Sequence, residues 1–343
     1  MTDAPAASEP IGRVETFDET SISGWLRVPE GGDARSLDLC LNGQPVAAAK
    51  TSDVIGQDGS DSIRRFRLRL KSLWNYTKST DRLSITFEGD PLFIEGHGFY
   101  RRPRKSGPHT SSELFSKIAA GYVFNQKGRL QLSKELDKEW QAAVFALYDR
   151  VRHFLKEELD TDLMVIYGTL LGAARAGKFI GRDHDFDVGY LSKETTPPEV
   201  KAEAERIIHA LWDAGYIIRV KKSCFYVKHP EIPGAQIDIG RLFFDKKGVL
   251  HSAFGFAGRC MFRLEDFDGY QEIELEGRNV LAVKNVAGLL RCIYGESWQI
   301  PNPGFHWRRE RARTSYKARF NAEEILRLTE YKATRADANA NAA

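Results

Sequence analysis

Hydrophobic and polar residues alternate along residues 11–98 with the period of a β-strand. The alternation is strict over residues 66–71, and the pair Asn42-Gly43 between two shorter runs is a strong signal for a β-hairpin. Short strands separated by turn residues predict a small β-sandwich over residues 11–98. Its basic positions form one stripe, which is typical of a solvated strand face; contact with an anionic glycan or lipid surface is the alternative. The stripe comprises Arg65, Arg67, Arg69 and Lys71.

The pattern changes after a basic segment rich in Pro, Gly and Ser at residues 99–111, which predicts a linker. Apolar residues then recur at helical spacing in residues 112–125 and 134–158. The remaining elements alternate in type: a buried strand (163–167), short helix (170–175), carboxylate strand (185–188), helix (196–214), β-hairpin (216–228), strand (236–244) and helix (284–293). This order predicts an α+β or α/β domain over residues 112–330, with a mixed sheet and flanking helices. We expect a disordered leader at residues 1–10 and a disordered tail at 331–343.

Composition excludes several classes of protein. The 343 residues carry 50 basic and 47 acidic side chains, a net charge of +3 that does not indicate nucleic-acid binding. The four cysteines form no C-x-x-C pair, which favours free thiols in a reducing compartment. No secretory signal or membrane span is recognisable, so we expect a cytoplasmic protein. The basic segments at 99–111 and 303–316 leave peripheral contact with an anionic surface, at the inner membrane face, as a further hypothesis.

Candidate chemistry is concentrated in residues 163–191. Asp183, Asp185 and Asp187 fall at every second position, so in a strand Asp185 and Asp187 point to the same side. Two neighbouring carboxylates repel each other and stay ionised most easily with a cation between them. Oxygen ligands select a hard ion, which predicts a Mg²⁺ or Mn²⁺ site.

The stretch GTLLGAARAGKFIGRDHDFDVGYL, residues 168–191, resembles the LicD/fukutin family. That family carries GTLLGxxR, then a turn with glycine and phenylalanine, then a D-x-D-x-D cluster, and it is similar to the nucleotidyltransferase superfamily. Two positions depart from the family pattern: Arg182 stands where tryptophan is usual, and His184 where aspartate is usual. A weaker second element is the Tyr-Gly, Trp and Pro pattern within residues 294–301.

The resemblance implies a nucleotidyltransferase-like fold and a third carboxylate from a later strand, for which Asp238 is the candidate. Asp185, Asp187 and Asp238 are then the predicted metal ligands and catalytic residues, with either Asp187 or Asp238 as general base. The alternative for Asp238 is a half-exposed strand aspartate satisfied by Arg241 or by a backbone donor. His184 is expected to point away from the carboxylate pair. The predicted donor-phosphate contacts are Gly168, Thr169, Arg175, Lys178 and Arg182.

The family resemblance also implies a reaction. A phospho-alcohol such as phosphocholine, ribitol phosphate or glycerol phosphate would move from a CDP-linked donor to a sugar hydroxyl of a cell-surface glycan. A metal-dependent glycosyltransferase or nucleotidyltransferase using the same aspartates is an alternative. A non-catalytic glycan-binding protein is the alternative from another class. The residues leave the identity of the donor, the acceptor and the oligomeric state open.

Overall fold

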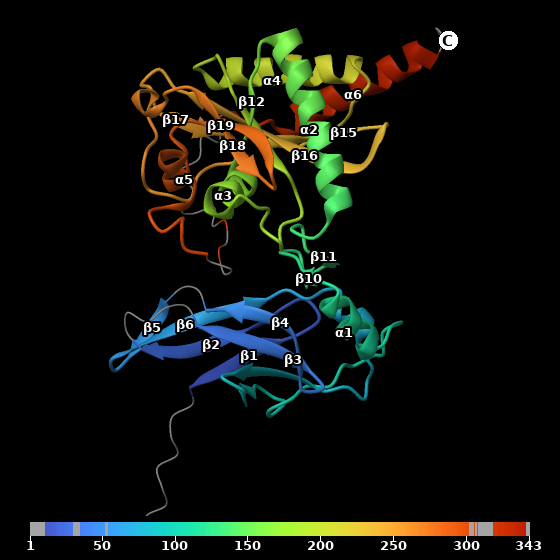
Figure 1. The fold of residues 1–343 in the computed structure, drawn as a ribbon, viewed down its shortest axis with the longest axis vertical. Helices are drawn as coiled ribbons and strands as arrows, with labels where there is room; N and C mark the ends of the chain where they lie inside the picture. The colour runs from blue at the N-terminus through green and yellow to red at the C-terminus, as the bar shows by residue number, and fades with distance from the viewer. Residues whose placement is uncertain are drawn as a thin grey trace, which may run out of the picture. The chain divides into compact units, whose positions relative to one another are not determined.

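The computed structural model describes residues 11–29, 35–51, 54–301, 305, 307 and 318–340 (Figure 1). The chain divides into two compact units, one comprising Met1–Ser133 and Pro301–His306 and the other Lys134–Ile300 and Trp307–Ala343. The leader expected at residues 1–10 lies outside the described residues. So does the basic segment at 303–316, apart from Phe305 and Trp307.

The first unit contains the predicted β-sandwich. One sheet has the strand order β5-β6-β2-β1-β9 and the other β4-β3-β7-β8, and their inner faces share one apolar core. Asn42 and Gly43 both adopt positive φ, 52° and 83°, at the hairpin predicted for them. The strands are β1 (Gly12–Phe17), β2 (Ile22–Pro29), β3 (Ser36–Leu41), β4 (Gln44–Lys50), β5 (Val54–Asp58), β6 (Asp61–Leu68), β7 (Leu83–Phe87), β8 (Asp90–Pro91) and β9 (Phe93–Ile94).

Residues 99–133 belong to the first unit, whereas a linker and the start of the second domain are expected there from sequence. Arg101 is buried and its guanidinium lies over the rings of Phe17 and Trp74. The following helix α1 (Ser111–Ala119) and hairpin β10–β11 (Tyr122–Phe124, Leu130–Leu132) bury Leu114 and Phe124 in the same core. The basic composition of residues 99–111 indicated an exposed linker. Arg101 is nevertheless buried, because an arginine can pack its guanidinium against aromatic rings.

The second unit is built on a mixed sheet with the order β12-β13-β16-β15-β14, to which β17 adds by pairing with β16. Strands β13 and β16 are parallel, while the other pairs are antiparallel. The strands are β12 (Leu163–Val165), β13 (Asp187–Leu191), β14 (Ile217–Val220), β15 (Cys224–His229), β16 (Ile232–Phe244) and β17 (Leu250–Ser252), with a separate hairpin of β18 (Tyr270–Leu275) and β19 (Arg278–Val283). The predicted mixed α+β architecture is confirmed.

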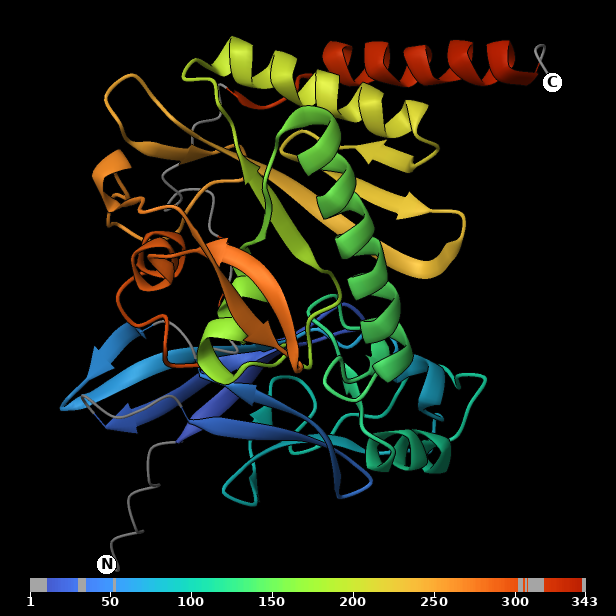
Figure 2. The ribbon, with the colours of Figure 1, turned by 45° about the horizontal axis from the view of Figure 1, so that its top comes forward.

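Helices cover both faces of this sheet (Figures 1 and 2). The predicted helices occur as α2 (Lys138–Leu159), α3 (Tyr167–Ala176), α4 (Pro197–Asp213) and α5 (Val286–Tyr294), with α6 (Ala322–Ala340) beside α4. Helix α2 packs through Phe145 and Tyr148 against Phe186, which precedes β13. Asp187 and Gly189 share one face of β13 because side chains alternate along a strand, and the start of α3 lies on that face, where Gly168 donates to Asp187.

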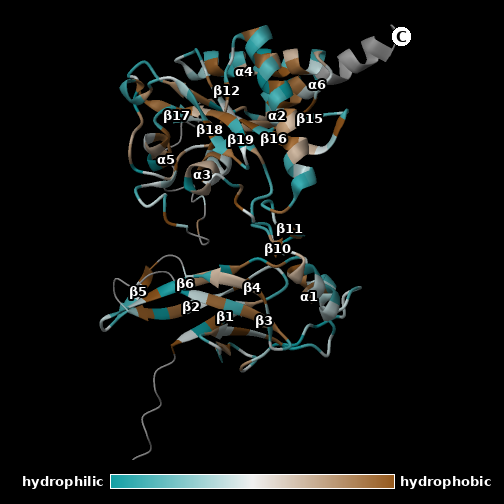
Figure 3. Cartoon of the chain, in the orientation of Figure 1, coloured by the Kyte–Doolittle hydropathy of each residue, from teal (hydrophilic) through white to brown (hydrophobic). Residues whose placement is uncertain are grey.

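Hydropathy along the ribbon follows this layering (Figure 3). Helices α2 and α4 alternate between hydrophilic and hydrophobic residues, and the strands of the first unit do the same. Each element therefore buries one face and exposes the other. Among the described residues, no helix combines the length and apolarity needed to cross a membrane.

The C-terminal segment corrects an expectation. Disorder is expected from sequence at residues 331–343, but α6 continues to Ala340. Its first turns are tied to α4 through ion pairs of Glu324 with Lys201 and of Arg327 with Glu205, and Leu328 is buried. Alanine has the highest helix propensity, so an alanine-rich segment extends a helix that tertiary contacts have already started.

A pair of glycines lets the chain approach the sheet closely beside the carboxylates. Gly189 of β13 lies opposite Gly240 of β16 in register. A Cβ at Gly189 would lie 2.6 Å from Cδ1 of Ile166, and one at Gly240 would lie 3.1 Å from the same atom. The glycines therefore leave room for Ile166 and Tyr167, the residues at the start of α3.

We expect Gly189→Ala to lower the free energy of unfolding by ~1–3 kcal/mol, since the added methyl overpacks a buried contact. Urea unfolding followed by circular dichroism measures the change. Adding Ile166→Val removes the clashing methyl group and should restore part of the loss. Gly56→Ala is the control, because its nearest neighbour would be Ile63 Cδ1 at 3.9 Å. A Gly189→Ala variant as stable as the parent would contradict the close packing.

Candidate active site

Three predicted carboxylates meet where the parallel pairing of β13 with β16 begins. Asp187, the first residue of β13, lies directly opposite Asp238 of β16. The N–H of Asp238 donates to the carbonyl of Phe186 at 2.9 Å, which extends the pairing past the start of β13. Asp185, Asp187 and Asp238 each offer one oxygen, and these oxygens lie within 4.8 Å of one another. Convergence of two adjacent strands thus produces the cluster predicted from sequence.

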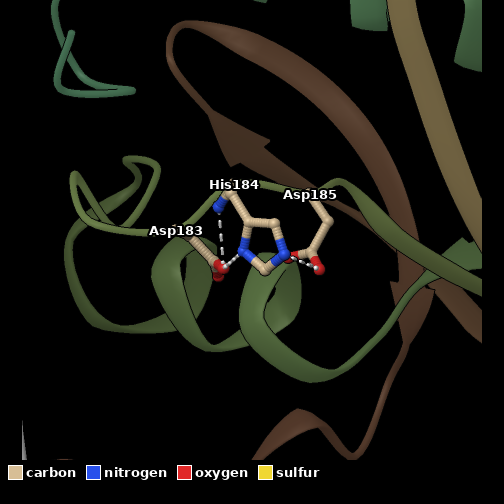
Figure 4. Close-up of side chains that lie close together, drawn as sticks. All are labelled: Asp183, His184 and Asp185. Carbon is tan, nitrogen blue, oxygen red and sulfur yellow. Dashed lines mark hydrogen bonds and ion pairs between the residues drawn. The ribbon is translucent and has the colours of Figure 1, made fainter. Parts of the chain in front are cut away.

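The segment before β13 departs from the regular strand expected for it. Residues 183–186 lie outside the strand, so strict alternation does not apply to them. His184 consequently turns its ring between Asp183 and Asp185 (Figure 4). Its Nε2 lies 3.3 Å from Oδ2 of Asp185, and its Nδ1 lies 3.8 Å from Oδ1 of Asp183. The expectation that His184 points away from Asp185 is therefore wrong, because it depended on a regular strand.

The start of α3 hydrogen-bonds to both the side chain and the backbone of Asp187. The N–H of Gly168 donates to Oδ2 of Asp187 at 3.0 Å, and the N–H of Asp187 donates to Oγ1 of Thr169 at 2.8 Å. A Cβ at Gly168 would lie 2.4 Å from Oδ2 of Asp183. A side chain at position 168 would therefore displace the carboxylate of Asp183, and both residues of the predicted Gly-Thr pair hydrogen-bond to Asp187.

Charge accumulates in this half-buried cluster. Burial, followed by the charges of nearby aspartates, raises the pKa of Asp187 well above its ordinary value. Burial and the charge of Asp185 likewise raise the pKa of Asp183. The cause is the concentration of carboxylates in a desolvated site. A divalent cation fits this donor set, because converging carboxylate oxygens are ligands for a hard ion and the ion offsets their repulsion.

The predicted phosphate contacts are dispersed. Arg175, in the last turn of α3, donates through Nε to the carbonyl of Trp298 at 2.7 Å and through its guanidinium to that of Ile300 at 3.1 Å. This arginine therefore joins the first sequence element to the second. Lys178 is exposed just after α3, and Arg182 is half-buried beside Asp183. Within this predicted set, Gly168 donates to the carboxylate of Asp187, and Thr169 accepts from the backbone N–H of Asp187.

Two residues beside Asp238 were not predicted from the sequence. Tyr226 of β15 lies opposite Asp238, and the amide of Gln236 donates to Oδ1 of Asp238 at 2.8 Å. Burial, then the charges of its neighbours including Asp238, raises the pKa of Tyr226 to about 12. The alternation of the predicted strand at 236–244 places Gln236 on the face of Asp238, which was the available signal. Arg241 does not partner Asp238: it is buried and donates to the carbonyls of Ala318 and Lys222.

An aromatic cluster lies next to the carboxylates. The ring of Tyr167 contacts Phe254 and Trp307 in edge-to-face geometry, with centroids 5.3 and 5.7 Å apart. Phe254 and Trp307 contact each other at 5.1 Å, and Tyr294 lies 5.6 Å from Trp307. Burial and then the charges of Asp187 and Asp183 raise the pKa of Tyr294, which places this ring near the carboxylates. Phe254 remains 38% exposed, so the cluster presents one ring to ligands.

This domain is of the nucleotidyltransferase type: it has a mixed sheet, a Gly-Thr turn and carboxylates at two adjacent strands. The family comparison agrees: residues 160–285 match the model described as "LicD/FKTN/FKRP, nucleotidyltransferase domain". Residues 160–285 are therefore similar to the LicD family, and the predicted resemblance is confirmed over this part of the chain. The match contains every residue of the carboxylate cluster, including Asp183 and Asp238.

Comparison with solved structures gives weaker likenesses. The lincomycin-bound lincosamide antibiotic adenylyltransferase LnuA is 20% identical, over 44% of this chain and 84% of that chain, with a TM-score of 0.27. Cid1, described with RNA terminal uridylyl transferase activity, is 21% identical over 32% of each chain, with a TM-score of 0.25. Scores this low add nothing to the family match. Among curated proteins, none matches the chain.

The raised carboxyl pKa values predict how stability changes with pH. A carboxyl whose pKa is raised in the folded state above ~3.9 favours folding at low pH, and this contribution is lost as pH rises through the folded pKa. Asp187→Asn removes the charge and keeps an acceptor for Gly168. We expect it to raise the Tm of EDTA-treated protein by ~2–4 °C at about pH 8, with little change near pH 5.

With added MgCl₂, the parent protein should become more stable than Asp187→Asn. The parent protein should gain thermal stability on addition of Mg²⁺, more at about pH 8 than near pH 5, because bound metal displaces protons from its ligands. Asp187→Asn should gain little at either pH. Equal thermal shifts in parent and variant would count against a metal site at Asp187.

Proposed function

We propose that this protein is a metal-dependent phosphotransferase that moves a phospho-alcohol from a CDP-linked donor to a sugar hydroxyl of a cell-surface glycan. The observation that carries the proposal is the register of Asp187 with Asp238, joined by Asp185, inside a LicD-family domain. The family supports a transferase; the CDP donor, the phospho-alcohol and the glycan acceptor belong to the proposal.

Asp185, Asp187 and Asp238 are the residues that would hold Mg²⁺ or Mn²⁺. When bound, such an ion neutralises charge on the donor phosphates and orients the leaving nucleotide. The backbone N–H of Gly168 keeps Asp187 oriented through a fixed hydrogen bond. Asp238 accepts from the side-chain amide of Gln236, and we assign removal of the acceptor proton to Asp238.

The aromatic cluster supplies a place for the nucleotide base. Phe254 is partly exposed, and its ring is fixed by Tyr167 and Trp307. Tyr167 is itself anchored, since its hydroxyl lies 2.5 Å from Oγ of Ser252. A planar base stacks favourably on such a ring, by ~1–3 kcal/mol per base. Closeness of the cluster to Asp187 keeps the base and the phosphates of one nucleotide within a single site.

We expect CMP to be released when the full chain is incubated with MgCl₂, a glycan acceptor and CDP-choline, CDP-ribitol or CDP-glycerol. Asp187→Asn and Asp238→Asn should each lower turnover more than about a hundredfold, near 2.7 kcal/mol. Removal of a ligand charge lowers metal occupancy, and removal of Asp238 also removes the base. Chromatographic quantification of CMP measures both effects.

Asp149→Asn is the matched control, because Asp149 lies on α2 and pairs with Arg278 at the surface. This variant should keep parental activity. Release of a nucleoside diphosphate from a sugar nucleotide would instead assign a glycosyltransferase, and pyrophosphate from a nucleoside triphosphate would assign a nucleotidyltransferase. Full CMP release by both active-site variants would refute the roles given to their aspartates.

The base site gives a separate prediction. Phe254→Ala should raise the KM for the CDP donor about tenfold, the loss of roughly 1.4 kcal/mol of stacking. The effect on kcat should be small, because the ring does not touch the reacting phosphate. Phe254→Trp should retain a low KM. Met261→Ala, another exposed apolar side chain of this unit, is the control. An unchanged KM in Phe254→Ala would exclude the base from this position.

A further inference from the structure

Exposed aromatic side chains are concentrated on the first unit. Among the described residues, the exposed aromatics are Phe93, Phe99, Tyr100 and Phe254, and the first three lie in one short segment of the β-sandwich unit. Phe99 is 57% exposed and Tyr100 43%. Phe93 and Phe99 contact each other, and a contiguous exposed apolar patch, unlike scattered single side chains, marks an interaction or ligand site.

Backbone pairing holds these rings beside the outer face of the second sheet. The N–H of Leu83 donates to the carbonyl of Arg101 at 2.9 Å, and the N–H of Arg101 returns a bond to Leu83 at 2.8 Å. This bridge keeps residues 99–101 next to β7. Ser84 is half-buried, and by strand alternation it faces outward because Leu83 and Ile85 are buried in the core.

The rings border a hollow of about 460 Å³ that is lined by polar as well as aromatic side chains. Its lining includes Asn42, Arg82, Ser84, Phe99 and Tyr100. The guanidinium of Arg82 lies 4.9 Å from the centre of the Tyr100 ring, which orients the ring and leaves N–H donors at the edge of the hollow. Phe93 supports Phe99 edge-to-face, with centroids 5.9 Å apart.

We propose that this hollow binds a saccharide chain. Flat aromatic faces match the C–H faces of sugar rings, and a few fixed donors match their hydroxyl groups, the mixture of apolar and polar groups that small-ligand sites use. Sugar binding here does not depend on the catalytic assignment. That the bound chain is the acceptor glycan rests on the proposed function, which then gains a second contact with the same polymer.

An array of immobilised oligosaccharides containing neutral, N-acetylated and uronic-acid sugars tests the proposal with the full chain. We expect binding to at least one saccharide, followed by calorimetry with the soluble form of that saccharide. Phe99→Ala and Tyr100→Ala should each weaken its affinity at least about tenfold, which corresponds to ~1.4 kcal/mol. Ile55→Ala is the control, since Ile55 is 45% exposed on β5 of the other sheet.

Absence of binding to every arrayed saccharide would overturn the proposal. So would unchanged affinity in both aromatic variants when circular dichroism shows that they are folded. Binding of acidic sugars alone, retained in these variants and lost on replacing Arg67 and Arg69 by Gln, would assign the site to the basic stripe. Saccharide binding without CMP release from any CDP donor would uphold the hollow and reject the proposed function, so the two failures are distinguishable.

Discussion

The parallel pairing of β13 with β16 is the constraint on which the catalytic unit depends. Its register sets Asp187 opposite Asp238 and, two residues further, Gly189 opposite Gly240. The first pair concentrates negative charge at one end of the strands. The glycine pair has no side chains, so Ile166 and the start of α3 can pack closely against β13 and β16. A slip of β13 by one residue would turn Asp187 and Gly189 to the other face of the sheet and separate them from Asp238 and Gly240.

Clustered carboxylates oppose folding unless something compensates them. Burial and then the neighbouring charges raise the pKa of Asp183 and Asp187, so the neutral form of each carboxyl is favoured over its ionised form. The backbone N–H of Gly168 lowers this cost for Asp187 only in part. Carboxyl groups with pKa values raised by burial and by neighbouring charges are typical of ligand-binding and catalytic sites.

Sequence alone predicted the local elements and the residue types of the site, because alternation and glycine turns are local properties. The strand beginning at 163, the strand at 236–244, the helix ending at Gly177 and the choice of Asp238 as a carboxylate on a later strand all followed from such patterns and the family resemblance. Positions set by irregular or distant contacts did not follow. His184 lies between Asp183 and Asp185 because residues 183–186 are not a strand, and Arg101 is buried because two distant rings enclose it.

Arg175 shows why the two sequence elements belong together. One end of α3 presents Gly168 to Asp187, and the other end presents Arg175 to the carbonyls of Trp298 and Ile300. The loop after α5 is thereby fixed to the same helix that orients the carboxylates. Tyr294, which begins the second element, lies close enough to Asp187 and Asp183 for their charges to raise its pKa. The arginine that sequence reasoning assigned to phosphate thus positions the loop after α5, and the two elements form one structural unit around α3.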